Sequence, residues 1–197
     1  MDTYKTISTQ SEGIYKEKGS KFLSFAIPVQ DVEEVKEIVK EYKKRFFDAR
    51  HVCYAYMLGA ERNEFRANDD GEPSGTAGKP ILGQINSREL TNILVIVVRY
   101  FGGVLLGTGG LVVAYKEATI DALNQAEIIE KTVDKFISIN FDYLLLNDVM
   151  RIIKDYNPQI ISQIFDNQCA MKLSIRKQDA DMLTTKLEKI MGLIIEK

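Results

Sequence analysis

The sequence contains no tryptophan, a single histidine, two cysteines and four prolines among its 197 residues. A zinc site needs about four ligands. One histidine and the widely separated Cys53 and Cys169 lack any metal-ligand spacing, so we expect no metal site. We interpret both cysteines as reduced thiols rather than as a disulfide. The longest apolar run, residues 93–98, is far shorter than the roughly 18 residues that a membrane-spanning helix requires, so we expect no contact with a membrane.

The sequence also lacks an excess of charge of one sign. Lys and Arg total 26, Asp and Glu total 28, and the formal net charge is −2. Domains that bind nucleic acid through their overall charge usually have a pI above about 9, whereas the pI here is about 5.6. The balance excludes binding to nucleic acid through total charge and leaves a local basic patch open. The first residues have no apolar core typical of a signal peptide, so we expect a cytoplasmic protein.

Hydrophobic periodicity predicts both helices and strands in the first two thirds of the chain. Apolar residues at helical spacing predict a helix from the N-cap Asp31 to about Phe47, and a second one over residues 111–126. We interpret residues 59–88, which are rich in glycine and polar residues, as a long functional or mobile connection. Alternation and β-forming residues predict strands at residues 4–8, 14–18, 21–28, 51–58 and 93–100.

The composition changes near residue 130, and the elements after it follow a recognisable order. The order β-α-β-β-α-β is typical of a ferredoxin-like domain. The sequence therefore predicts an α+β protein of two domains, residues 1–129 and 130–197. The elements expected in the second domain are strand 132–142, helix 146–156, strands 160–166 and 170–176, helix 180–191 and strand 193–196.

A first candidate site is the segment DDGEPSGTAGKP at residues 69–80. Its three carboxylates suit Mg²⁺ binding or acid–base chemistry, and its glycines suit an anion cradle of backbone N–H groups. The alternative is a solvated acidic turn, because Asp-Gly and Pro are turn residues. It is not a Walker loop, since Pro73 and Pro80 stand where that motif needs Gly and Ser or Thr. The candidate residues are Asp69, Asp70, Gly71, Glu72, Ser74, Gly75, Thr76, Gly78 and Lys79.

A second candidate site is the segment RYFGGVLLGTGG at residues 99–110. A strand that ends in Arg, followed by glycines that open a helix, is suited to anion binding, because the first helical N–H groups and the guanidinium point at the ligand. It is not a dinucleotide fingerprint, since Val112 stands where the third glycine belongs. The alternative is that the glycines serve tight turns and that Arg99 forms a structural ion pair. The candidate residues are Arg99, Tyr100, Phe101, Gly102, Gly103, Gly107, Gly109 and Gly110.

The single histidine, His51, begins a predicted strand after Arg50. A nucleophile, a histidine and an acid can assemble in space from distant positions, here Ser74 or Thr76, His51, and Asp69 or Asp70. The catalytic candidates are His51, Asp70, Glu72 and Ser74. The alternative is a capping or surface histidine, which is the commoner role of a lone residue of this type.

These motifs together resemble the Impact family. The resemblance is carried by ARHVCYAY at residues 49–56, by the segment 69–80, and by VRYFGGVLLGTGGL at residues 98–111. It implies a first domain similar to a domain of ribosomal proteins and translation factors, and a second domain similar to the ferredoxin-like last domain of elongation factor G. One position departs from the family pattern, because Val113 stands where that pattern has Arg. The loss of this basic residue weakens the hypothesis that the chain binds the phosphate backbone of a nucleic acid.

The sequence is compatible with three functions. The favoured hypothesis is a regulatory module that binds RNA, the ribosome or translation factors, in which Lys21, Arg50, Lys79 and Arg99 converge on one face. The second is a hydrolase or other enzyme acting on a small phosphorylated or carboxylated molecule, in which four residues, His51, Asp70, Glu72 and Arg99, line one closed pocket. The third is a protein-interaction adaptor. In the first two hypotheses the two segments lie side by side with Arg99 between them. We expect no cofactor, and the oligomeric state stays open.

Overall fold

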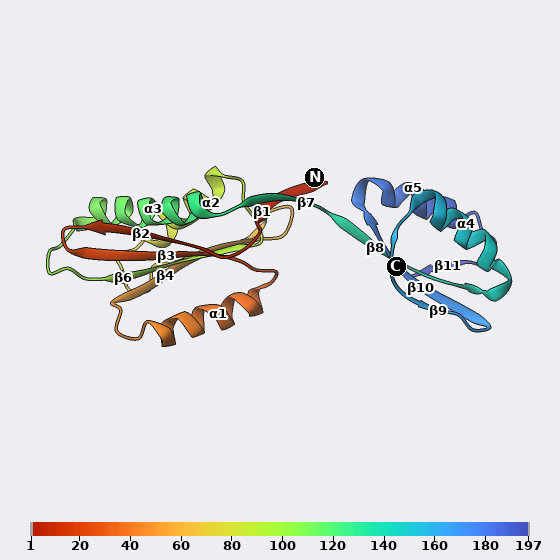
Figure 1. Ribbon diagram of the computed structural model, residues 1–197, viewed down its shortest axis with the longest axis horizontal. Helices are drawn as coiled ribbons and strands as arrows, with labels where there is room; N and C mark the ends of the chain where they lie inside the picture. Colours follow the sequence, from red (N-terminus) through yellow and green to blue (C-terminus); the bar gives the residue numbers. More distant parts are fainter. Residues whose placement is uncertain (1, 197) are drawn as a thin grey trace. The chain divides into compact units, whose positions relative to one another are not determined.

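The computed structural model describes residues 2–196, which divide into two compact units (Figure 1). Residues Tyr4–Lys131 form the larger unit, and the residues from Thr132 onward, together with Asp2 and Thr3, form the smaller one. The predicted α+β class is confirmed. The division at residues 129 and 130 into separate domains stays a prediction. No helix among the described residues is long and apolar enough to cross a membrane.

A five-stranded antiparallel sheet forms the centre of the larger unit. Its spatial order is β2-β3-β6-β4-β5. Strand β6 lies in the middle, and all of its apolar residues are fully buried because helices cover both faces of the sheet. The bounds of the strands are β2 Ser11–Glu17, β3 Ser20–Pro28, β4 His51–Leu58, β5 Glu64–Asn68 and β6 Ile93–Tyr100.

The two faces of this sheet have separate cores. Helix α1 (Val32–Arg45) covers one face, and its Val35, Val39 and Tyr42 pack on the even-numbered residues of β4 and β6. Helices α2 (Gly78–Ser87) and α3 (Gly107–Gln125) cover the other face, which is built from the odd-numbered residues of these strands. Figure 1 shows α1 on the opposite side of the sheet from α2 and α3. Successive strand residues point to opposite faces, so each position of β4 and β6 is assigned to one core.

A short two-stranded sheet joins the ends of the larger unit. Strand β1 (Thr3–Ile7) is hydrogen-bonded to β7 (Ile128–Thr132). The Lys5 carbonyl accepts the N–H of Thr91, and the Asn92 carbonyl accepts the Thr6 hydroxyl, so β1 is also tied to the segment that leads into β6.

The smaller unit has the predicted ferredoxin-like order. Its strands are β8 (Asp134–Asp142), β9 (Gln159–Ile164), β10 (Gln168–Arg176) and β11 (Ile194–Glu196), and they form an antiparallel sheet in the order β11-β8-β10-β9. The short 3-10 helix η1 (Tyr143–Leu145) precedes α4 (Leu146–Tyr156), and α5 (Lys177–Leu187) follows β10. The core of this unit lies between the two α-helices and one face of the sheet.

The structure corrects the interpretation of residues 59–88 as a connection. This segment contains β5 and the whole of α2. The sequence pattern hid both, because the edge strand β5 has little buried surface and therefore no alternation, while α2 carries two glycines and a proline in ten residues. Helix α3 also begins four residues earlier than predicted, at Gly107, because glycines form its first turn.

Candidate functional site

A pocket of about 330 Å³ lies where the two glycine-rich segments meet at the start of α3. The loop after β5 contributes one side, the segment after β6 and the first turn of α3 contribute the other, and the ends of β4 and β6 form the floor. Arg99 therefore lies between the two segments, as predicted. The lining residues are Arg50, His51, Glu72, Pro73, Arg99, Phe101, Leu105, Leu106, Gly107, Thr108 and Leu111.

A buried ion pair forms the floor of this pocket. Arg99 Nη1 donates to Glu72 Oε1 at 2.5 Å, and the two side chains are 7% and 3% exposed. The guanidinium also lies over the rings of Phe22 and Phe101, with 5.6 and 5.7 Å between its central carbon and the ring centroids. The alternative for Arg99, a structural ion pair, is therefore present. The Nε atom of the same guanidinium is buried and has no hydrogen-bond partner among the described residues, so anion binding by Arg99 stays a prediction.

Tyr115 completes the environment of Glu72 from α3. Its hydroxyl donates to Glu72 Oε1 at 2.8 Å, and the thiol of Cys53 lies 3.3 Å from the same hydroxyl. Burial raises the pKa of both Tyr115 and Cys53 well above their usual range, so both groups keep their protons near neutral pH. Glu72 Oε1 thus receives two donors, and Oε2 is left to face the pocket.

His51 stands beside that free carboxylate oxygen. Its Nδ1 lies 2.8 Å from the backbone carbonyl of Asp70, which can only accept, so the proton of the neutral ring is assigned to Nδ1. Its Nε2 is then an acceptor that lies 3.8 Å from Glu72 Oε2. This distance is too long for a direct hydrogen bond. One O–H donor placed between the two atoms can serve both.

A left-handed turn presents the Asp70 carbonyl to His51. Asp70 has φ of +42° and Gly71 has φ of +87°. Aspartate and glycine are the residues that adopt this region most readily. A Cβ on Gly71 would lie 3.5 Å from His51 Nδ1, an ordinary contact, so a larger residue would strain the turn through its positive φ rather than clash with the imidazole.

The backbone N–H groups around Gly75 and Gly78 bind a carboxylate of the protein itself, that of Asp69. The Asp69 carboxylate accepts the N–H groups of Gly75, Ala77 and Gly78 at 2.8, 3.0 and 2.8 Å. Burial raises the pKa of Asp69, but these backbone donors outweigh it and the pKa lies below its ordinary value. The carboxylate holds the loop against the start of α2 and is not available to a ligand.

The other side of the pocket is formed by the start of a helix that has no side-chain cap. Helix α3 begins at Gly107 after Leu106, which supplies no side-chain cap. The first N–H groups of a helix attract anions, and the helix dipole adds to this attraction. Arg50 is exposed at the rim, and Thr108 lies in the same first turn. This side favours a negatively charged group, while Leu105, Leu106 and Phe101 give it an apolar wall.

Sequence reasoning overlooked Tyr115 among the site residues. The signal was present, because Tyr115 lies in a stripe of small buried residues on α3, and a buried tyrosine hydroxyl needs a hydrogen-bond partner. The apolar lining from Leu105, Leu106 and Leu111 carries no comparable signal.

The remaining candidates lie outside the pocket. The exposed Ser74 is at the tip of the 69–80 loop, the Thr76 hydroxyl donates to the Pro73 carbonyl, and Lys79 is exposed on α2. Tyr100 points to the α1 face and donates to Asp48. Gly102 packs on the β2–β3 turn, Gly103 is exposed in the next turn, and Gly109 and Gly110 lie in the first turn of α3.

The expected convergence of Lys21 with Arg99 is wrong. Lys21 pairs with Tyr100 in the β3–β6 ladder, whereas Phe22 pairs with Arg99. Successive residues of a strand point to opposite faces, so Lys21 and Arg99 lie on opposite sides of the sheet. The expected pocket of four residues is found in part, since His51, Glu72 and Arg99 line it and Asp70 supports it from behind. Among residues 2–196, no group of three or more His, Cys, Asp or Glu side chains is arranged to hold a metal ion.

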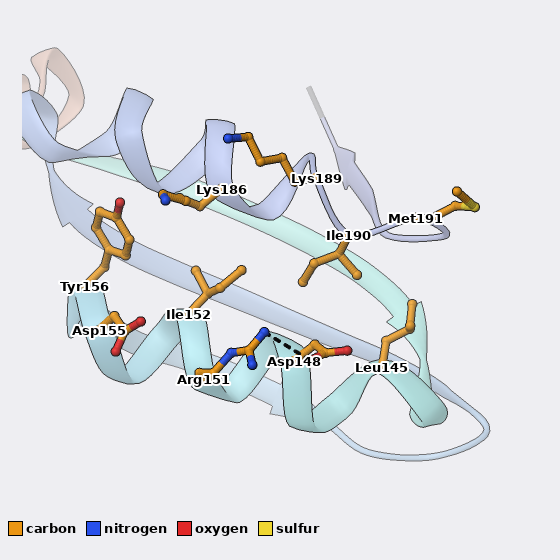
Figure 2. A pocket seen from close by; sticks show the side chains of 10 residues that line it. All are labelled: Leu145, Asp148, Arg151, Ile152, Asp155, Tyr156, Lys186, Lys189, Ile190 and Met191. Carbon is orange, nitrogen blue, oxygen red and sulfur yellow. Dashed lines mark ion pairs between the residues drawn. The ribbon is translucent and has the colours of Figure 1, made fainter.

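The smaller unit has a larger and more open hollow of about 790 Å³ between α4 and the end of α5. Figure 2 shows Ile152 of α4 and Ile190 pointing toward each other across it, with Lys186 and Lys189 on one side and Asp155 on the other. None of the candidate residues of the sequence analysis lines this hollow.

Comparison with known proteins identifies the chain's relatives. The model of the Impact N-terminal domain matches residues 18–123, which is more than half of the chain. An IMPACT family member of Haemophilus influenzae is 33% identical over 181 residues, covering 90% of this chain and 88% of that protein. IMPACT family member YigZ of Escherichia coli is 34% identical over 160 residues, covering 80% and 78%.

A solved structure extends the similarity to the whole chain. The crystal structure of a hypothetical protein aligns with a TM-score of 0.77 at 29% identity, covering 99% of this chain and 97% of that one. The family match spans β3 to α3, and so includes every residue that lines the pocket. The chain belongs to the Impact family.

Proposed function

We propose that the larger unit is an enzyme that hydrolyses a small molecule carrying a phosphate or carboxylate group, with His51 as the general base. The observation that carries this proposal is the convergence of His51 Nε2 and Glu72 Oε2, 3.8 Å apart, in a pocket of about 330 Å³. The pocket changes the order of the hypotheses drawn from the sequence. Arg99 is committed to Glu72, so the basic surface that the RNA hypothesis needed from it is not there.

Each residue of the pocket has a separate role in this proposed reaction. His51 Nε2 and Glu72 Oε2 together accept the two protons of one water molecule, which orients its lone pair toward the substrate. Arg99 and Tyr115 fix Glu72 through its other oxygen, and the Asp70 carbonyl fixes the ring of His51. The N–H groups of Gly107 and Thr108, with Arg50 at the rim, bind the anionic group. His51 takes the proton of the attacking water as the bond to the leaving group breaks.

The test is turnover of nitrophenyl esters of phosphate and of short dicarboxylic acids by the full chain. We expect nitrophenolate release that falls by about 10²–10⁴-fold in His51→Asn, the range of general acid–base catalysis. Arg50→Ala should raise KM more than it lowers kcat. Lys79→Ala is the control, because Lys79 is exposed outside the pocket. Turnover that His51→Asn leaves unchanged, or none by the folded protein, would overturn the proposal.

A second candidate function is an RNA- or translation-apparatus-binding regulatory module in the smaller unit. The open face of its sheet carries Phe136 on β8, 60% exposed, and Lys172 on the adjacent β10, whose ammonium lies 5.3 Å from the ring centroid. Aromatic side chains on the middle strands of such a sheet stack on unpaired RNA bases in other proteins.

Fluorescence anisotropy with labelled single-stranded and structured RNA, at two salt concentrations, tests this candidate. We expect salt-dependent binding that Phe136→Ala and Lys172→Ala weaken. Phe65→Ala is the matched control, because Phe65 is similarly exposed at 58% but belongs to the larger unit. Binding that the three variants affect equally would refute this function.

A further inference from the structure

A second groove lies on the α1 face of the larger unit, on the opposite side of the sheet from the His51 pocket. It has a volume of about 360 Å³, comparable to pockets that hold small ligands. Helix α1 forms one wall, and β4 with the edge strand β5 forms the other. The lining residues are Val32, Val35, Lys36, Val39, Lys40, Lys43, Tyr54, Tyr56, Arg66, Asn68 and Asp70.

The charge of this groove is strongly positive, in contrast to the balanced charge of the chain. Lys36, Lys40 and Lys43 are spaced by four and three residues, so they follow one stripe of α1. Arg66 adds a fourth cation from β5, and the lining contains one carboxylate, that of Asp70. Glu33 pairs with Lys36 from outside the groove, but both side chains are more than 60% exposed, so this pair is weak.

The floor of the groove is aromatic and apolar. Tyr54 and Tyr56 lie on the same face of β4, and the register places Asn68 opposite Tyr54 and Arg66 opposite Tyr56. Valines of α1 complete the floor. Tyr56 is only 7% exposed, so the half-buried Tyr54 is the more accessible ring of this floor. A partly apolar floor beside a row of cations fits a molecule that has a ring system at one end and several negative charges at the other.

We propose that this groove binds a nucleoside di- or triphosphate, with the nucleoside against Tyr54 and Tyr56 and the phosphates on Lys36, Lys40, Lys43 and Arg66. Four cations line the place of the phosphate chain, although Lys36 also pairs with Glu33 and Lys43 with Asp70. Aromatic side chains hold bases by stacking. A volume of about 360 Å³ suits one such molecule, and a longer strand is an outcome that the test below distinguishes.

Asp70 connects this groove to the His51 pocket. Its carboxylate pairs with Lys43 and accepts the Val52 N–H at 2.7 Å, and its carbonyl accepts the Nδ1 proton of His51. A phosphate that takes Lys43 from Asp70 removes one of the two contacts that hold this carboxylate. The ring of His51 then responds to a ligand on the far side of the sheet. This regulatory part rests on the proposed function, whereas binding to the groove does not.

Calorimetric titration of the full chain with ATP, ADP, adenosine, inorganic triphosphate and a ten-nucleotide RNA tests the binding. We expect ATP to bind more tightly than adenosine and triphosphate. The double variant Lys40→Ala/Arg66→Ala should weaken ATP binding by at least about tenfold, through the loss of two charge-assisted contacts. Lys44→Ala is the matched control on α1, because Lys44 is exposed and does not line the groove.

The named alternatives would each overturn the site as proposed. Equal affinity for triphosphate and ATP would show that the groove does not recognise the nucleoside. Binding of the RNA alone would show that the groove is a strand-binding surface. No effect of the double variant on ATP binding would place the ATP site elsewhere. Because the chain has one histidine, the ring protons of His51 give an unambiguous NMR signal. A shift on ATP addition that the double variant Lys40→Ala/Arg66→Ala abolishes supports the coupling without any catalytic assay. An unmoved signal with bound ATP, or a shift that the double variant keeps, refutes it.

Discussion

Replacing Glu72 by Ala tests the buried ion pair on which the pocket rests. The change removes the carboxylate that Arg99 and Tyr115 both contact, and leaves a guanidinium that is 7% exposed without its partner. Breaking a buried pair by removing one member costs about 3–5 kcal/mol. The loss of the Tyr115 acceptor adds to this, but the adjacent pocket lets water reach both groups. We therefore expect the free energy of unfolding to fall by about 3–5 kcal/mol.

Urea unfolding followed by circular dichroism measures this change, with the transition of the larger unit fitted separately. The control is Glu89→Ala, which breaks an exposed pair with Lys5 and should leave the unfolding midpoint nearly unchanged. The double variant Glu72→Leu/Arg99→Met leaves no unpaired charge and should recover most of the loss. A cost below about 1 kcal/mol for Glu72→Ala, or a double variant less stable than the single one, would refute the reasoning.

Three further outcomes are expected. The pKa of Asp69 in the folded protein lies below its ordinary value of 3.8. The ionised carboxylate therefore stabilises the fold above pH 3.8, and this stabilisation is lost as the pH falls through the folded pKa. Acid unfolding of Asp69→Asn should accordingly depend less on pH than acid unfolding of the wild type. Gly102→Ala would place a Cβ 1.9 Å from the Gly19 carbonyl carbon, and thermal unfolding should show a loss of about 1–3 kcal/mol; an unchanged midpoint contradicts this contact. Tyr115→Phe removes one of the two donors to Glu72. Urea unfolding should show that the free energy of unfolding falls by about 1–2 kcal/mol. An unchanged free energy of unfolding would contradict the hydrogen bond between Tyr115 and Glu72.

The elements that sequence analysis predicted best are those with a strong period. Residues 93–100 form β6 and residues 146–156 form α4 at the predicted bounds, because each has a clear buried pattern. Strand β5 was not predicted, since an exposed edge strand leaves no alternation. The helical start at Gly107 was missed for a related reason, because glycine has a low helix propensity and its helical state here depends on the surrounding structure.

The sequence indicated which residues meet at this pocket and less well which contacts they make, and their role as a functional site stays a prediction. Linear motifs indicated that His51, Glu72 and Arg99 belong together, and the structure brings all three to one pocket. Sequence alone could not show that Arg99 is neutralised by Glu72, because a fork for an external anion and a buried ion pair require the same residue. Whether a side chain faces α1 or α3 depends on strand register, which the sequence does not give, and the register places Lys21 opposite Tyr100 rather than Arg99.

The Asp69 carboxylate, seated among the N–H groups of its own loop, has a consequence for the speed of ligand capture. Because these donors are already occupied, the loop that carries Glu72 and Pro73 does not have to order itself when a ligand arrives. Binding should then follow a single concentration-dependent phase in stopped-flow experiments, with an association rate that is set by diffusion and charge rather than by a slow closure step. A rate that reaches a plateau at high ligand concentration would reveal a gate elsewhere in the pocket wall.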